Sequence, residues 1–384
     1  MIDFSEFESI CPYTDEEAVA ALTKIADEPF IVKMSKYIYP EEEENYLCEH
    51  LKEVTCINDF QSLVMSKLVE RVIETSVKSF SYDGISNIEN EKGKYLAMSN
   101  HRDIILDPAI LQLVLFRHKL PLTEIAVGDN LLQNSFIEAL IRSNRMIKVL
   151  RGISARELYL SSQILSKYIR LKITSGESSV WLAQRQGRTK NGLDITEQGL
   201  LKMLDMSGTS SFEENFNELN IIPLSISYEY EPCDILKARE LLISRSGKYV
   251  KAQGEDINSI LTGVKQWKGC VHLNIGSKLK NEELAVAALC DKNDRYQLIR
   301  HAVDMRVIDG YKLWKTNFIA SDLKNKSTKY SDRYTPEEKD AFKDYTEKQL
   351  DKVEPELDRN ELRNVFWGIY EGPIVSKQLL SMEV

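Results

Sequence analysis

Hydrophobic residues follow two different periods along this chain of 384 residues, and the change of period predicts its organisation. Up to about Phe80, apolar residues recur at spacings of three and four positions, most clearly between residues 63 and 72, as on one face of a helix. A first helix is expected to begin at Thr14 or Asp15, because either residue can cap it and the carboxylates that follow suit the helix dipole. We therefore predict a helical N-terminal domain over residues 1–81.

From residue 82 onward, short β-like runs alternate with helical runs. The strand-like runs are residues 95–98, 124–127, 146–150, 179–183, 221–228 and 271–276. The helical runs between them are residues 108–116, 136–141, 155–173 and 200–206. Alternation of this kind is typical of an α/β domain whose sheet has a parallel component. We predict a mixed, partly parallel sheet flanked by helices over residues 82–280, and a helical, charged C-terminal extension over residues 281–384.

Composition and charge limit the classes of protein that remain. Hydrophobic residues make up 43% of the chain and charged residues 28%, which is ordinary for a soluble globular protein. The net charge of −9 gives no support for a nucleic-acid partner. Part of the acidity lies at residues 41–44, a run that we expect to be a solvated connection between helices.

The compartment can be predicted from the cysteines and the apolar runs. The six cysteines are scattered and include no Cys-x-x-Cys pair, which favours reduced thiols. No run is long and apolar enough to span a bilayer, and the acidic N-terminus lacks the layout of a signal peptide. We expect a cytoplasmic protein that meets lipid, if at all, peripherally at the inner face of the membrane.

The segment of residues 99–107 is the first candidate for chemistry. His101 follows the predicted strand 95–98, and the carboxylates of Asp103 and Asp107 follow it. A histidine at a strand end can act as a general base on a hydroxyl, and a neighbouring carboxylate can fix its tautomer. We therefore predict a catalytic pair of His101 with one of the two aspartates.

Structural roles for these residues are the alternative. Asp107 directly precedes Pro108, an arrangement that also fits a helix N-cap followed by proline at the first helical position. Asp103 could instead be held by Arg102, and His101 could be a structural histidine in a turn.

Two further strand ends carry basic residues. Arg151 follows the apolar run 146–150 and would lie at the carboxyl edge of the sheet, where open α/β sheets bind ligands. Its planar guanidinium suits a phosphate group. The loop after the run 179–183 has the composition of an anion-binding loop, with glycines that allow close backbone approach and several bases. Its candidate residues are Arg185, Gln186, Gly187, Arg188 and Lys190. A surface arginine and a solvated basic loop are the alternatives.

In order and spacing, these motifs resemble the glycerophosphate acyltransferase superfamily, the enzymes that acylate glycerol 3-phosphate and lysophosphatidate. The four blocks of that family are a strand followed by Asn-His-(x)4-Asp, an apolar strand that ends in Arg, an apolar strand followed by Glu-Gly-x-Arg, and an apolar strand with an early Pro. The matches are Asn100-His101 with Asp107, then Arg151, then Gln186-Gly187-Arg188, and finally Pro223 within residues 222–226. The resemblance covers roughly residues 82–275.

Two positions depart from the family pattern. Five residues separate His101 from Asp107 where the family has four, and Gln186 stands where the family has Glu. The segment His-Arg-Asp-x-x-x-Asp, the Gln-Arg-x-Gly-Arg loop and the long helical N-terminal extension are similar to a bacterial soluble subgroup.

The resemblance implies an O-acyltransferase of the glycerol-3-phosphate acyltransferase fold. It implies that His101 deprotonates an acceptor hydroxyl, that Asp107 orients His101, and that Arg151, Arg188 and Lys190 hold the phosphate of the acceptor. Arg102, Arg185, Gln186 and Gly187 are also expected to contact substrate. The implied donor is acyl-CoA or acyl carrier protein, with no metal and no further cofactor.

The acceptor implied by the resemblance is glycerol 3-phosphate or 1-acylglycerol 3-phosphate in phospholipid biosynthesis. The alternatives are another lysolipid or an amino-acid lipid as acceptor, or a homologue that binds lipid or acyl carrier without catalysis. The sequence His-Arg-Asp also occurs in protein kinases. That class fails here because no Asn lies five positions after Asp103 and the chain contains no Asp-Phe-Gly.

Overall fold

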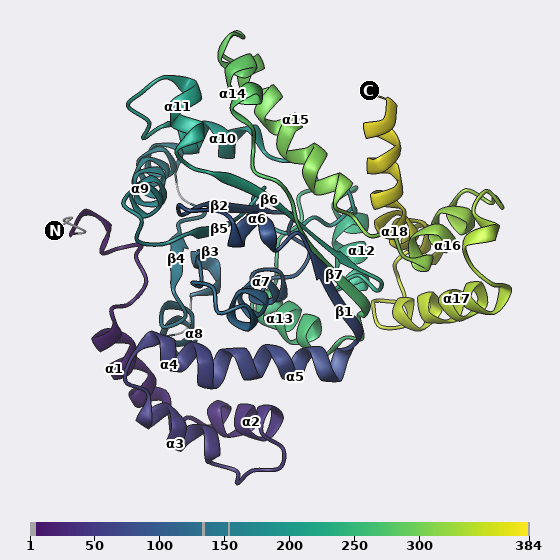
Figure 1. Ribbon diagram of the computed structural model, residues 1–384. Helices are drawn as coiled ribbons and strands as arrows, with labels where there is room; N and C mark the ends of the chain where they lie inside the picture. The colour runs from purple at the N-terminus through teal and green to yellow at the C-terminus, as the bar shows by residue number, and fades with distance from the viewer. Residues whose placement is uncertain (1–4, 133–134, 153, 383–384) are drawn as a thin grey trace.

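The computed structural model describes residues 5–132, 135–152 and 154–382, and it contains a seven-stranded mixed sheet between two layers of helices (Figure 1). The strands are β1 (Val77–Asp83), β2 (Leu96–Ser99), β3 (Glu124–Gly128), β4 (Met146–Val149), β5 (Val180–Ala183), β6 (Ile221–Tyr228) and β7 (Gly269–Ile275). Their order in the sheet is β1-β7-β6-β2-β5-β3-β4. Because β7 is antiparallel to β6 while every other pairing is parallel, the predicted mixed, partly parallel sheet is confirmed.

The central strand β2 pairs in parallel with β5 on one side and β6 on the other. All four of its residues are buried, as expected for a strand of a parallel sheet that is covered on both faces. The strands β2, β3, β4 and β5 run in the same direction, so the loops that follow them meet at one edge of the sheet.

The first strand was not predicted, because Val77–Phe80 had been assigned to the N-terminal helices. Helix α5 (Ser66–Ser76) ends at Ser76, and Val77 takes an extended conformation with φ −124° and ψ 129°. The strand that follows pairs with β7 alone, at the edge of the sheet. β1 crosses the first predicted domain boundary; the division into three domains stays a prediction.

Alternate residues of β2 face two separate apolar layers. Leu96 and Met98 pack with α9 (Ala155–Thr174), α10 (Gln198–Asp205) and α15 (Asp294–Asp309). Ala97 packs on the opposite face with α7 (Leu106–Arg117) and α5. The two layers lie above and below the sheet in Figure 1.

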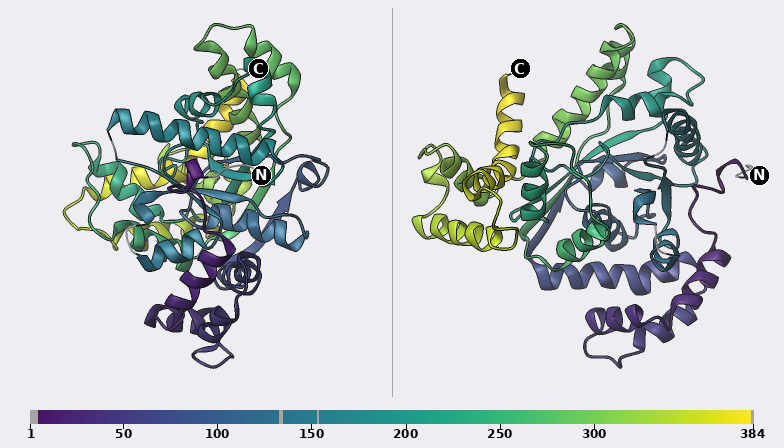
Figure 2. Two further views of the ribbon diagram at one scale, coloured as in Figure 1. Left: turned by 90° about the vertical axis from the view of Figure 1, so that its left-hand side faces the viewer. Right: turned by 180° about the vertical axis from the view of Figure 1, so that it is seen from behind.

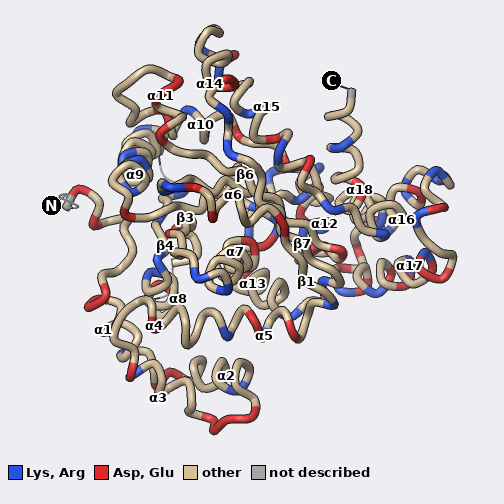
Figure 3. The backbone as a smooth tube through the Cα atoms, viewed as in Figure 1, with Lys and Arg blue, Asp and Glu red and all other residues tan. Residues whose placement is uncertain are grey.

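The N-terminal helices form their own apolar cluster against α8 (Ser135–Arg142). They are α1 (Asp15–Ile25), α2 (Pro29–Ile38), α3 (Tyr46–Glu53) and α4 (Ile57–Phe60), with a π-helical segment Gln61–Met65 that leads into α5. Helix α1 is capped by Thr14, whose side chain accepts a hydrogen bond from the Glu17 N–H, as in a capping box. Residues 41–44 are exposed between α2 and α3, where Figure 3 shows an acidic segment.

The C-terminal helices lie on the far side of the sheet from the N-terminal ones (Figure 2). α16 (Lys315–Lys324), α17 (Pro336–Leu350) and α18 (Arg359–Met382) form an apolar cluster with α12 (Asp234–Ile243). The other helices are α6 (Ser86–Glu89), α11 (Phe212–Asn217), α13 (Glu255–Lys265) and α14 (Asn281–Ala288), with 3-10 turns at Ser5–Phe7, Asp129–Leu131 and Ser331–Arg333. None of the described helices has the length and apolar composition needed to cross a membrane.

Candidate active site

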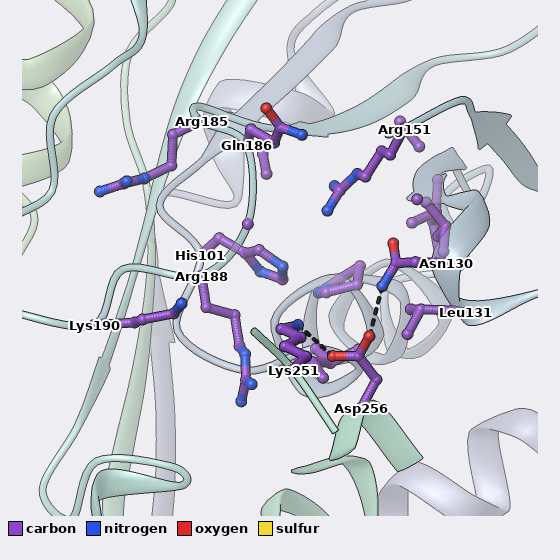
Figure 4. Close-up of a pocket in the computed structure, with 18 of the residues that line it drawn as sticks. His101, Asn130, Leu131, Arg151, Arg185, Gln186, Arg188, Lys190, Lys251 and Asp256 are labelled. Carbon is purple, nitrogen blue, oxygen red and sulfur yellow. Dashed lines mark hydrogen bonds and ion pairs between the residues drawn. The ribbon is translucent and has the colours of Figure 1, made fainter. Parts of the chain in front are cut away.

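A pocket of about 280 Å³ lies where the loops after β2, β3, β4 and β5 meet (Figure 4). The topology brings together residues that are far apart in the sequence, because the carboxyl ends of these parallel strands share one edge. Seven of the predicted site residues line the pocket: His101, Arg151, Arg185, Gln186, Gly187, Arg188 and Lys190.

His101 forms a hydrogen bond with the buried carboxylate of Asp107. Its Nδ1 lies 3.0 Å from Oδ2 of Asp107, whose side chain is fully buried. Oδ1 of Asp107 accepts a hydrogen bond of 2.8 Å from the Tyr228 hydroxyl. A carboxylate only accepts, so Nδ1 of the neutral imidazole carries the proton and Nε2 keeps its lone pair. The geometry therefore suits a general base whose tautomer is fixed by Asp107.

The extra residue between His101 and Asp107 is accommodated by a tight turn around the carboxylate. The backbone N–H groups of Arg102 and Asp103 both donate to Oδ2 of Asp107. The turn places Asp107 in the first turn of α7, from which its side chain reaches back to His101.

Asp103 has a different role from Asp107. Its Oδ1 accepts hydrogen bonds from the N–H groups of Ile105 (2.9 Å) and Leu106 (2.8 Å), so Asp103 holds the turn that leads into α7. Its Oδ2 is buried against Gly263, where a Cβ atom would lie 2.2 Å away. Of the two predicted partners, the structure brings Asp107 to His101. Asp107 lies inside α7, so it is not the N-cap residue that the alternative assumed.

Asn100 fixes the backbone from which His101 projects. Its side-chain oxygen accepts from the Ile226 N–H (2.8 Å), and its nitrogen donates to the Ile226 carbonyl (3.1 Å) and to Asp194 (2.9 Å). The carbonyl of His101 accepts from the N–H of Thr189 at 2.7 Å. The end of β2 is thus tied to β6 and to the loop after β5.

Arg102 does not line the pocket, contrary to the prediction that it contacts substrate. Its guanidinium is only 4% exposed and lies 2.7 Å from Asp194 and 3.4 Å from Glu231. Burial alone would lower the pKa of Arg102, but these two carboxylates raise it well above its usual value. Arg102 does not hold Asp103 either, because its guanidinium is paired with Asp194 and Glu231.

We expect the substitution Arg102→Met to lower the free energy of unfolding by about 3–5 kcal/mol, because it leaves the buried Asp194 without its cation. Urea unfolding of the wild type and the variant measures the difference. Arg117→Met is the matched control, since Arg117 is 41% exposed and lies 3.6 Å from Glu70. A loss no larger than that of the control would show that the buried ion pair does not stabilise the site.

Three arginines of the pocket have buried nitrogen atoms without a hydrogen-bond partner among the described residues. These atoms are Nε of Arg151, Nε of Arg185 and Nη1 of Arg188. Burial lowers the pKa of Arg151, although the charges of Asp129 and Asp256 oppose this shift. Buried N–H donors that lack a protein acceptor are costly, and a bound anion would satisfy them. Figure 4 shows Arg151 directed towards the centre of the pocket and Arg185 extended away from His101.

The loop after β5 is shaped by two glutamates. The N–H of Gln186 donates to Glu197 at 3.1 Å, and Gly187 has a positive φ of 73° that only glycine adopts readily. Lys190 forms an ion pair with Glu240, so its charge is less available to a ligand than the arginine charges are.

The sequence did not predict several of the residues that line the pocket. They are Asn130, Lys251 and Asp256, and the apolar wall of Pro108, Ile125, Ala126, Val127 and Trp181. Asn130 follows β3, so the strand-end rule that singled out Arg151 also applied to it. Lys251 comes from the segment between α12 and α13, and Asp256 from the first turn of α13, where no local pattern marks a site.

A smaller apolar cavity of about 40 Å³ adjoins the pocket and shares Pro108 and Ile125 with it. It is lined by α5, α7 and the first residues of β3 and β4, with Val69 and Leu113 among its lining residues. Across the described residues, no three His, Cys, Asp or Glu side chains are gathered as a metal site.

The α/β region that carries the pocket is similar to a known family of enzymes. Residues 79–226 match the family model named Acyltransferase. This match lies within the region whose motifs resemble the glycerophosphate acyltransferase superfamily, and it makes this part of the chain similar to acyltransferases.

Two curated relatives are similar to this domain. The dihydroxyacetone phosphate acyltransferase of Oryctolagus cuniculus is 24% identical over 186 residues, which is 48% of this chain and 26% of that protein. The protein of the same name from Bos taurus is 22% identical over 185 residues, with the same coverage. The chain thus spans about a quarter of the length of these relatives.

Among solved structures, the chain is similar to the 1-acyl-sn-glycerophosphate (LPA) acyltransferase PlsC from Thermotoga maritima. The TM-score is 0.36 at 12% sequence identity, and the match covers 75% of this chain and 93% of that one.

Proposed function

We propose that this protein transfers a fatty acyl group from a thioester donor, acyl-CoA or acyl carrier protein, to a hydroxyl of glycerol 3-phosphate or 1-acylglycerol 3-phosphate. The proposal rests on one juxtaposition: the His101–Asp107 pair opens into the same pocket as the unpartnered nitrogens of Arg151 and Arg188. A base beside an anion site is what the acylation of a phosphorylated alcohol requires.

In the proposed reaction, Nε2 of His101 takes the proton of the acceptor hydroxyl while its oxygen attacks the thioester carbonyl. The tetrahedral intermediate then collapses, the carbon–sulfur bond breaks, and the imidazolium returns the proton to the thiolate. Asp107 stabilises the imidazolium while it carries that proton. The product is an ester, and the thiol is released.

The remaining walls of the pocket fit the two substrates. Arg151 and Arg188 would bind the phosphate of the acceptor through charge-assisted hydrogen bonds. The apolar wall beside His101 would receive the start of the acyl chain, and the cavity that shares Pro108 and Ile125 offers it further apolar surface. We propose that no cofactor is needed besides the donor, and that the protein acts in the cytoplasm or at the inner surface of the membrane.

The decisive experiment is thiol release by the purified protein, with palmitoyl-CoA or palmitoyl acyl carrier protein as donor. Glycerol 3-phosphate and 1-acylglycerol 3-phosphate serve as acceptors, and glycerol is the matched acceptor without phosphate. We expect thiol release that depends on a phosphorylated acceptor, together with an acylated product detected by mass spectrometry. Binding of both substrates without turnover would contradict the enzymatic proposal and indicate a lipid- or carrier-binding homologue.

The phosphate site is tested in the same assay by the substitution Arg151→Ala. We expect it to raise the KM of the acceptor far more than that of the donor. Arg333→Ala is the control, because Arg333 is exposed on the C-terminal helices and does not line the pocket. An effect confined to the KM of the donor would contradict the phosphate role.

A further inference from the structure

The pocket holds oxygen acceptors as well as cationic donors, and the phosphate does not account for them. Asn130 and Asp256 lie on the side of His101 away from Arg185 and Lys190 (Figure 4). Asn130 follows β3 in the turn Asp129–Leu131, and Asp256 is in the first turn of α13. A dianionic phosphate would be repelled by the oxygens of both residues, so they must face a different part of the ligand.

The hydrogen bonds fix which atom of the Asn130 amide is free. Nδ2 of Asn130 donates to Oδ2 of Asp256 at 2.8 Å. Because a carboxylate only accepts, the nitrogen of the amide must face Asp256 and the oxygen must face away. This oxygen, Oδ1 of Asn130, is buried and has no hydrogen-bond partner in the described part of the chain.

Asp256 is an ionised acceptor held in place from two sides. Lys251 forms an ion pair with it, and Asn130 donates to its other oxygen. Burial would raise the pKa of Asp256, but these hydrogen bonds lower it below its usual value. Both Asn130 and Asp256 therefore present acceptor atoms to the pocket.

The free oxygen of Asn130 lies next to the free N–H of Arg151, over Gly128. A Cβ atom on Gly128 would lie 2.5 Å from Oδ1 of Asn130 and 2.5 Å from Nε of Arg151. The missing side chain leaves room for both groups at the end of β3, and both buried atoms lack a partner among the residues that the structure describes. One ligand could satisfy the two atoms at once if it carried an anionic oxygen for Arg151 and, a few bonds away, a hydroxyl for Asn130.

We propose that Asn130 and Asp256 form a hydroxyl-binding subsite for the acceptor, which takes a free hydroxyl adjacent to the phosphate ester and selects a polyol phosphate over a keto phosphate. The inference rests on the proposed acyl transfer to a phosphorylated acceptor. In glycerol 3-phosphate the C2 hydroxyl is adjacent to the phosphate-bearing carbon, while the C1 hydroxyl is left for His101. The ketone oxygen of dihydroxyacetone phosphate at the same place only accepts and would face two other acceptors.

The test compares three acceptors that differ only at C2: glycerol 3-phosphate, 3-hydroxypropyl phosphate, which lacks the hydroxyl, and dihydroxyacetone phosphate. We expect kcat/KM of the wild type to be about 10- to 100-fold higher for glycerol 3-phosphate than for either analogue, which is the range for one hydrogen bond with a charged partner. In Asn130→Ala this ratio should fall towards one, mainly through loss of activity on glycerol 3-phosphate. Asp256→Asn, which keeps the size of the side chain, should also reduce the ratio if Asn130→Ala is too unstable to assay.

The matched control is Asn45→Ala, because Asn45 is exposed and makes no side-chain cap hydrogen bond. It should leave the ratio unchanged. A wild type that uses the three acceptors equally well, or a ratio that stays the same in Asn130→Ala and Asp256→Asn, would overturn the subsite.

A failure of the subsite must be distinguished from a failure of the proposed function. Calorimetric Kd values for glycerol 3-phosphate and 3-hydroxypropyl phosphate make this distinction. If the wild type shows no turnover with any acceptor, the proposed reaction is wrong. The subsite is then decided by binding alone: a Kd ratio of about tenfold or more that is lost in Asn130→Ala upholds it, and equal Kd values reject it.

Discussion

His101→Ala is expected to lower kcat for acyl transfer by about 10²–10⁴-fold, the range that a positioned general base contributes. His101 is the one imidazole among the described residues that line the pocket. Lys190 and Lys251 are ion-paired with Glu240 and Asp256, and both oxygens of Asp256 already accept hydrogen bonds. The described residues that line the pocket include no cysteine.

The loss should occur without unfolding and without loss of acceptor binding. The side chain of His101 is 13% exposed and opens into a cavity, so its removal deletes little buried contact. His118→Ala is the matched control: His118 bonds to Tyr82 and Glu89, both at 2.9 Å, and does not line the pocket. Rates of thiol release, melting temperatures and calorimetric binding of glycerol 3-phosphate distinguish the two variants. A His101→Ala protein that turns over like the wild type would rule out His101 as the base.

The strands of the parallel region could be predicted because they are buried on both faces and therefore read as apolar runs. The run 221–228 coincides with β6, and the run 95–98 differs from β2 by one residue at each end. β1 was missed because an edge strand with exposed positions directly continues a helix, and its residues pair only with a strand nearly two hundred positions later. Only the tertiary contact distinguishes this segment from the helix before it.

The residues of the site also divide into those that the sequence predicts and those that it does not. His101, Arg151 and Arg188 follow buried strands, so topology alone gathers them at one edge of the sheet. Arg102 was expected to contact substrate because it adjoins His101 in sequence, yet its side chain is buried in an ion pair with Asp194. Asp256 comes from a helix far downstream, and nothing in its neighbourhood predicts that α13 reaches the pocket.

Asp107→Asn is expected to reduce kcat strongly, whereas Asp103→Asn should leave it close to the wild-type value. Three donors converge on Oδ2 of Asp107: Nδ1 of His101 and the N–H groups of Arg102 and Asp103. They would hold the amide oxygen of an asparagine in the same place, with its nitrogen turned to the Tyr228 hydroxyl, which can accept. The tautomer of His101 is therefore kept, and only the negative charge that stabilises its imidazolium is lost.

The expected reduction for Asp107→Asn is a factor of roughly 10²–10⁴, where the upper value is that of the same substitution in a Ser-His-Asp triad. We expect the lower part of this range, because in that triad the tautomer is lost as well. At position 103 the asparagine oxygen can still accept from the N–H groups of Ile105 and Leu106, so the turn that leads into α7 is kept. Rates and melting temperatures of the two variants, measured side by side, decide between the carboxylates. A larger loss of kcat in Asp103→Asn than in Asp107→Asn would show that the 3.0 Å pair of His101 and Asp107 is not the catalytic one.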